Sequence, residues 1–204
     1  MTRAEPLPPE LRDEPFEDAA ALVRGISRSR LRASDLRVPH RGVRVTATAS
    51  GDPAARIAAH AVPMAADEYF SHTTAALLYG IPLPRATAGA GRIDVSVQFP
   101  PHPPQVRGIV GHRLSVPIAP RTRKGLRMVS PARTWTQLAA VLEHDDLVIA
   151  GDYLVKRKAP LCTWEVLAAA VSSTGPARGA LAGPTDSIRG PWSCVPRVDS
   201  EQTT

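Results

Sequence analysis

Apolar residues recur along the chain in blocks, and their spacing predicts short helices and strands. The clearest block begins at Ser130 and Pro131, because a hydroxyl can cap a helix and proline fits its first position. The apolar positions that follow have helical spacing, and they predict one buried stripe made of Trp135, Leu138, Ala139 and Leu142.

The remaining blocks after residue 50 are shorter. Ser71 is predicted to cap a helix that Gly80 ends, since glycine accepts the left-handed conformation found there. Strands are predicted where β-branched residues are bounded by glycine or proline, over 92–99, 107–116 and 125–130. Helices are predicted over 53–62, 71–79, 145–158 and 163–171.

The N-terminal part has a different order of elements. Residues 15–24 predict a short helix that Gly25 ends, and Ser27 is a candidate N-cap for a second helix over 27–34. The residues after Asp35 alternate as in two short strands, with Gly42 between them. Helix, tight turn, helix and β-hairpin is the order of a winged helix-turn-helix.

These elements predict the α+β fold class. The expected organisation is a disordered leader over 1–14, a winged-helix-like unit over 15–50 and a mixed domain over 51–172. The mixed domain should contain about three strands and four helices. Residues 173–204 mix glycine, proline and polar residues without periodicity, so we expect a disordered or out-of-frame tail.

Charged residues are unevenly distributed along the chain, and their distribution suggests a binding surface. The net charge is +6, and residues 24–44 hold seven arginines against the single acid Asp35. Between Asp94 and Glu143 there is no acidic residue. Arginines on a second helix and a wing can reach guanine edges and phosphates, although a solvated surface of an arginine-rich protein is the alternative. The predicted DNA-binding residues are Arg28, Arg30, Arg32, Arg37, Arg41 and Arg44, with His40 beside them on the wing.

Motifs for catalysis and metal binding are absent from the sequence. There is no Gly-rich phosphate loop and no HExxH, CxxC or GxSxG. Asp94 could open a metal-dependent nuclease site, but no acid-x-Lys follows it. Ser71 beside His72 suggests a nucleophile–base pair, yet capping plus packing is the favoured interpretation. We therefore expect no catalytic residue, no metal site and no cofactor.

Composition predicts the compartment. The N-terminus has no signal-peptide pattern and no apolar run is long enough to span a membrane, so a cytoplasmic location without a membrane partner is expected. Cys162 and Cys194 lie far apart, which indicates neither a disulfide framework nor a zinc site.

Several strings occur in one order that resembles a large actinobacterial family. They include PFEDAAALVRGISRSRLRASDLRVPHRGVRV, FSHTTAALLYGIPLP, IDVSV, RGIVGHRL, GLRMVSPARTWTQLAA and DDLVIAGDYLVKRKAPLCTWEVLAAAV, and they cover about residues 14–172. Members of that family begin with a region similar to AbiEi-type antitoxins of type IV toxin–antitoxin systems. They usually end in a domain similar to very-short-patch-repair endonucleases, whose acidic metal-binding residues have no counterpart here.

The resemblance implies a non-catalytic, DNA-binding protein of antitoxin-like or regulatory type. Duplex DNA and a cognate toxin are the implied partners. The alternatives are a truncated remnant of the endonuclease family that lacks its nuclease domain, and a protein-interaction domain.

Overall fold

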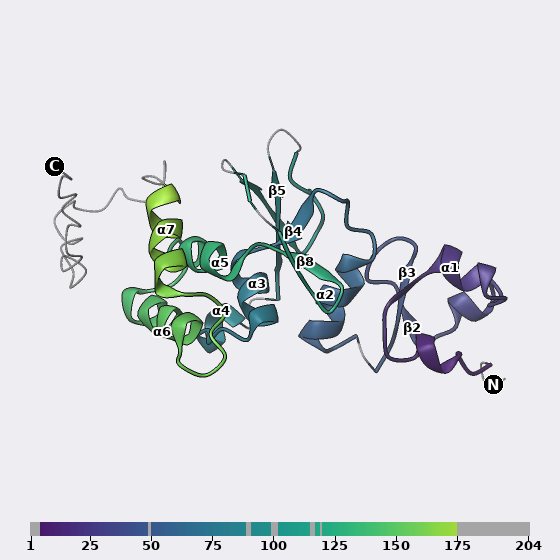
Figure 1. The fold of residues 1–204 in the computed structure, drawn as a ribbon. Helices are drawn as coiled ribbons and strands as arrows, with labels where there is room; N and C mark the ends of the chain where they lie inside the picture. The colour runs from purple at the N-terminus through teal and green to yellow at the C-terminus, as the bar shows by residue number, and fades with distance from the viewer. Residues whose placement is uncertain are drawn as a thin grey trace, which may run out of the picture.

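Two β-sheets organise the chain, a small one near the N-terminus and a larger one in the middle (Figure 1). This computed structural model describes residues 5–48, 50–88, 91–98, 102–114, 117–118 and 120–174. Helices and sheets are both present, so the predicted α+β class is confirmed. The predicted tail lies outside the described residues from residue 175 onward.

The N-terminal unit follows the predicted order of elements in outline. Its three strands, β1 (Phe16–Glu17), β2 (Leu36–Arg37) and β3 (Val43–Thr46), pair antiparallel in the order β1-β3-β2. Gly42 has a φ of +78° in the turn before β3, as a tight hairpin requires. The described helical segments of this unit are η1 (Pro9–Leu11), α1 (Asp18–Val23) and η2 (Arg30–Arg32).

The predicted second helix over 27–34 is wrong in length. It is a single 3₁₀ turn, η2, that ends where Ala33 becomes extended. Ser27 Oγ accepts the backbone N–H of Arg30 at 3.2 Å and also lies 2.9 Å from Ser29 Oγ. Such side-chain bonds compete with helix propagation, and a short turn results.

The predicted leader is also corrected. Leu7 is 4% exposed and Leu11 is 6% exposed, and both pack in a cluster with Phe16, Ala21 and Leu31. Residues 5–14 therefore belong to the folded N-terminal unit, because Leu7 and Leu11 complete its small core.

The larger sheet lies at the centre of the molecule with strand order β6-β5-β4-β8-β7. β5 pairs parallel with β6, and β4 pairs parallel with β8, while the other two pairs are antiparallel. Five described strands replace the three expected, since β4 and β7 have three residues each and show no readable period. The strands are β4 (Glu68–Phe70), β5 (Ile93–Gln98), β6 (Ile109–Leu114), β7 (Arg121–Arg123) and β8 (Leu126–Met128).

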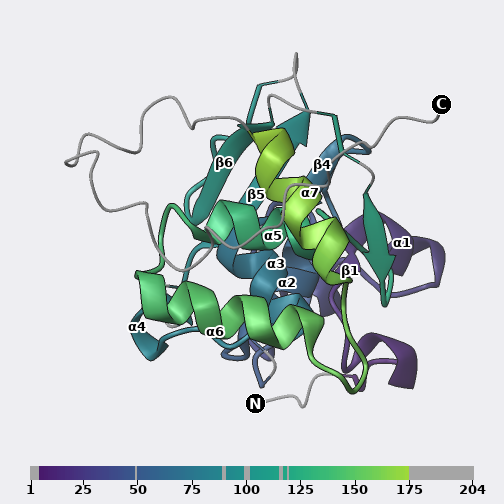
Figure 2. The ribbon, with the colours of Figure 1, turned by 60° about the vertical axis from the view of Figure 1, so that its left-hand side comes forward.

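Helices cover both faces of this sheet (Figures 1 and 2). α2 (Pro53–Ala61) lies on the side of the N-terminal unit, and its His60 ring is 6.2 Å from Phe70. α3 and α5 pack on the other side, with α6 and α7 outside them. Those helices and the short α4 are α3 (His72–Tyr79), α4 (Arg85–Ala88), α5 (Pro131–Leu138), α6 (His144–Val155) and α7 (Trp164–Thr174).

The predicted stripe of α5 is only partly present. Ser130 Oγ accepts the N–H of Arg133 as predicted, and Leu138 is fully buried. The helix ends at Leu138, so Ala139 is exposed and Leu142 belongs to the following turn. Trp135 is half-buried, and its indole N–H donates to the carbonyl of Leu147 at 2.8 Å. Among the described helices, none is long and apolar enough to cross a membrane.

Candidate nucleic-acid interface

A cleft of about 350 Å³ separates the N-terminal unit from α2 and the start of the larger sheet. Four basic side chains from three separate segments line it, and no aspartate or glutamate is among its described lining residues. Apolar side chains such as Ile93 and Ile109 form its floor. The basic residues are Arg37, His40, Arg56 and Arg107.

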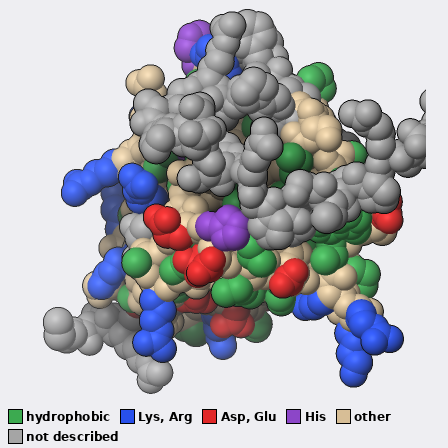
Figure 3. Space-filling view, turned by 90° about the vertical axis from the view of Figure 1, so that its left-hand side faces the viewer, with side chains coloured by type: hydrophobic (Ala, Val, Ile, Leu, Met, Phe, Trp, Pro, Cys, Tyr) green, Lys and Arg blue, Asp and Glu red, His purple; other side chains and the backbone are tan. Residues whose placement is uncertain are grey.

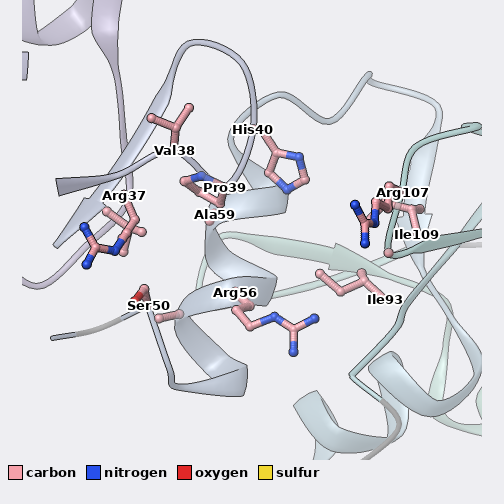
Figure 4. Close-up of a pocket in the computed structure, with 13 residues that line it drawn as sticks. Arg37, Val38, Pro39, His40, Ser50, Arg56, Ala59, Ile93, Arg107 and Ile109 are labelled. Carbon is pink, nitrogen blue, oxygen red and sulfur yellow. The ribbon is translucent and has the colours of Figure 1, made fainter. Parts of the chain in front are cut away.

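The arginines of the cleft come from elements that the fold brings together. Arg56 and Arg107 extend into the same space beside Ile93, while Arg37 lies at the opposite margin, past Pro39 (Figure 4). Arg56 comes from α2, and Arg107 precedes β6. This arrangement provides positive charge from two sides of one opening.

Backbone carbonyls orient two of these guanidinium groups. Arg56 Nη2 donates to the carbonyl of Gly91, and Arg37 Nη1 donates to the carbonyl of Ser34 at 2.9 Å. Carbonyls do not neutralise the positive charge, and each guanidinium has five N–H donors, so donors are left for a ligand. Arg107 is exposed and forms no ion pair with any described residue.

One histidine, His40, lines the cleft, and a second, His60, packs behind it. His40, in the turn between β2 and β3, is half-buried and lines the opening. Its ring centroid is 4.9 Å from that of His60, which is 4% exposed on α2. Burial, followed by the nearby His40, lowers the pKa of His60 to about 4, and burial also lowers the pKa of His40.

The structure removes two arginines from the predicted DNA-binding set. Arg30 is 7% exposed, and its guanidinium forms two hydrogen bonds with Asp35, at 2.9 and 2.8 Å. Arg44 forms an ion pair with Asp18 at 3.1 Å and donates to the carbonyl of Leu31. Both guanidinium groups hold the N-terminal unit together, so they are occupied rather than available to DNA.

The other four predicted arginines are exposed. Arg28 precedes η2, Arg32 ends it, and Arg37 and Arg41 lie on either side of His40. None of these four forms an ion pair with a described residue. Of this set the structure brings only Arg37 into the cleft, together with His40.

Sequence reasoning missed Arg56 and Arg107. Arg56 is a single arginine in an alanine-rich helix, and Arg107 lies about fifty residues further along the chain. Neither stands in a local cluster of charge. The acid-free stretch after Asp94 indicated a basic surface that includes Arg107. It did not indicate that Arg56 of α2 lies beside it.

A second polar cluster lies on the opposite side of the sheet, around Asp94 of β5. One oxygen of this carboxylate accepts a hydrogen bond from His112 Nε2 at 2.9 Å, and the other accepts one from the Thr73 hydroxyl. Asp94 is 8% exposed, and its burial opposes the charge. The hydrogen bonds from His112 and Thr73 outweigh that burial and hold the pKa of Asp94 below its usual value.

Ser71 does not cap α3 through its side chain, contrary to the prediction. Its hydroxyl lies 3.1 Å from His72 Nδ1, and its own helix-capping bond is missing. His72 has a φ of +46°, and its ring stacks on that of His112 with centroids 3.7 Å apart. Burial first, and then the charge of His112, lowers the pKa of His72 to about 4. Ser71 is fully buried, so this pair is part of the packing rather than an exposed nucleophile.

The end of the molecule formed by α6 and α7 has a different charge. Figure 3 looks onto this end, where acidic and apolar side chains mingle and basic ones stand toward the margin. Asp145 and Asp146 occupy the first turn of α6, where they suit the positive end of the helix dipole. Among the described residues, no group of three acids, histidines or cysteines could hold a metal ion.

The chain was compared with known proteins. It matches no protein-family model and no curated protein.

Proposed function

We propose that this protein is a non-catalytic DNA-binding protein, of antitoxin-like or regulatory type, that holds the phosphate backbone in the cationic cleft. The observation that carries the proposal is the acid-free cleft lined by Arg37, Arg56 and Arg107. Guanidinium groups match phosphate oxygens in geometry and charge. Contacts between arginines and phosphates hold a protein on the duplex without recognising the base sequence.

The N-terminal unit carries further exposed arginines that could contact DNA. Arg41 follows His40 in the turn that leads into β3. Arg28 precedes the 3₁₀ turn and Arg32 ends it, in the place where a winged helix-turn-helix has its recognition helix. Because that turn is too short to fill a major groove, we expect backbone contacts to dominate and sequence preference to be weak.

Salt dependence tests the proposal. Each phosphate that a protein neutralises releases counterion, with a log–log slope of about −0.9 per contact on duplex DNA. If the three arginines of the cleft each hold a phosphate, the slope of the parent protein should be about −3 or steeper. Fluorescence anisotropy with a labelled duplex across a salt series measures it.

A matched pair of triple variants locates the contacts. Arg37→Ala, Arg56→Ala and Arg107→Ala together should flatten the slope by up to about three units. The control removes the same charge from the exposed β7 turn, through Arg121→Ala, Arg123→Ala and Lys124→Ala, and should have the smaller effect. The proposal fails if the parent shows no salt-dependent binding, or if the control variant loses more than the cleft variant.

The non-catalytic part of the proposal rests on Asp94. This carboxylate would have to bind a cation in a nuclease site, but His112 and Thr73 already occupy both of its oxygens. We therefore expect no cleavage of duplex DNA with magnesium or manganese. Nicking by the purified parent that disappears in Asp94→Ala would contradict this expectation and favour the endonuclease alternative.

The antitoxin-like part rests on the family resemblance. We expect a neighbouring gene that encodes a nucleotidyltransferase-like toxin. We also expect that toxin to co-purify with this chain. An out-of-frame nuclease sequence downstream would favour the endonuclease remnant instead.

A further inference from the structure

His40 stands apart from the arginines of the cleft because it can change its charge near neutral pH. Its ring lines the same opening as Arg56 and Arg107, from the turn of the N-terminal unit (Figure 4). Arg37 of β2 and Arg41 are its basic neighbours along the chain, and His60 of α2 backs its ring at 4.9 Å. No carboxylate among the described lining residues faces it.

A proton on His40 is unfavourable while the cleft is empty. The ring is half-buried, which lowers its pKa, and its charge would add to that of the surrounding guanidinium groups. A phosphate group in the cleft would reverse this balance, since an opposite charge within hydrogen-bonding range favours the protonated imidazole.

His60 cannot take the proton in place of His40. It is 4% exposed, and neither of its ring nitrogens has a hydrogen-bond partner among the described residues. A charge there would be buried and unpaired, which is costly. The neutral ring of His60 instead fixes the position of His40 by packing against it, so a proton gained in the cleft resides on His40.

We propose that His40 binds a phosphate in the cleft beside the arginines and takes up one proton from solvent when that phosphate enters. This inference rests on the proposed DNA-binding function and names a ligand residue and a pH dependence for that site. It follows that affinity for duplex DNA rises as the pH falls, because binding and protonation are linked.

The test is the affinity for a labelled duplex at fixed salt between pH ~8 and pH ~6. Uptake of one proton strengthens binding by at most about tenfold per pH unit, so we expect the parent to gain roughly three- to tenfold over this range. His40→Gln keeps the arginines but cannot titrate, so its affinity should change little on acidification. His144→Gln, at an exposed position at the start of α6, is the matched control and should gain as much as the parent.

A second measurement follows the proton itself. In the full-length protein, the imidazole C2 proton signal that His40→Gln removes should report a higher pKa with duplex bound than without it. The inference is overturned if the pKa of His40 is the same with and without duplex, or if His40→Gln has the pH dependence of the parent. The proposed function still stands in that case, provided that binding of the duplex depends on salt. Absence of duplex binding at every pH overturns the proposed function, and the inference with it.

Discussion

His60 is buried in the interface between α2 and the N-terminal unit, with both ring nitrogens unpartnered among the described residues. The folded protein therefore resists protonating it, and its pKa falls from 6.5 to about 4. The unfolded chain binds that proton more readily, so stability is present above pH ~6.5 and is lost as the pH falls toward 4. Replacing His60 by leucine, which is similar in volume and suits a helix, should remove this source of acid sensitivity.

The two pKa values fix the expected size of the effect. A group with a pKa of 6.5 in the unfolded chain and about 4 in the folded protein loses about 2 kcal/mol of stability between pH ~7.5 and pH ~5. Burial also lowers the pKa of His72, so the parent should lose further stability over this range through that residue. His60→Leu should lack the loss of about 2 kcal/mol that comes from His60. At neutral pH it should be about 1 kcal/mol more stable, because two buried polar atoms without partners are gone.

Urea unfolding at the two pH values measures both differences. His144→Leu is the control, since it removes a histidine whose side chain is 68% exposed. Equal loss of stability in the parent and in His60→Leu would refute the reasoning. It would mean that the His60 ring finds a hydrogen-bond partner, or is protonated, in the folded protein.

Two further predictions concern the fold. Arg30→Ala should destabilise the protein by about 2 kcal/mol, because the buried guanidinium of Arg30 is hydrogen-bonded to the exposed carboxylate of Asp35. Arg28→Ala should change stability by less than about 0.5 kcal/mol in the same urea assay, and equal effects would show that Arg30 is solvent-accessible. Gly111→Ala should cost about 1–3 kcal/mol by thermal unfolding, since a Cβ there would lie 2.6 Å from Pro103 Cβ and 2.7 Å from the Pro104 carbonyl oxygen. Gly51, with open space around it, is the control position for the same substitution, and a harmless Gly111→Ala would mean that the proline segment moves away.

Local sequence determined most of the regular elements. α2, α3 and β5 lie where apolar spacing, Ser or Pro starts and Gly ends predicted them. Two elements of three residues, β4 and β7, were missed because a period needs several residues to show. Helix ends differed for another reason, since α5 stops at Leu138 where the chain turns to place Trp135 against α6.

The sequence also predicted one part of the candidate site and missed another. The sequence alone placed a dense run of arginines on the N-terminal unit, because charge density is a local property of the chain. The sequence could not distinguish paired arginines from unpaired ones. The guanidinium groups of Arg30 and Arg44 are paired with Asp35 and Asp18, whereas Arg41 is exposed.

Only the tertiary structure decided which basic residues meet. The elements β4, α3, α4 and β5 lie between Arg56 and Arg107 along the chain, yet α2 and the start of β6 border one opening with His40. Burial, ion pairing and the closeness of distant segments depend on how elements pack, whereas helix and strand formation depends mainly on neighbours in sequence. The sequence therefore determined which elements form and where positive charge is dense, and packing decided which of those charges are left for a ligand.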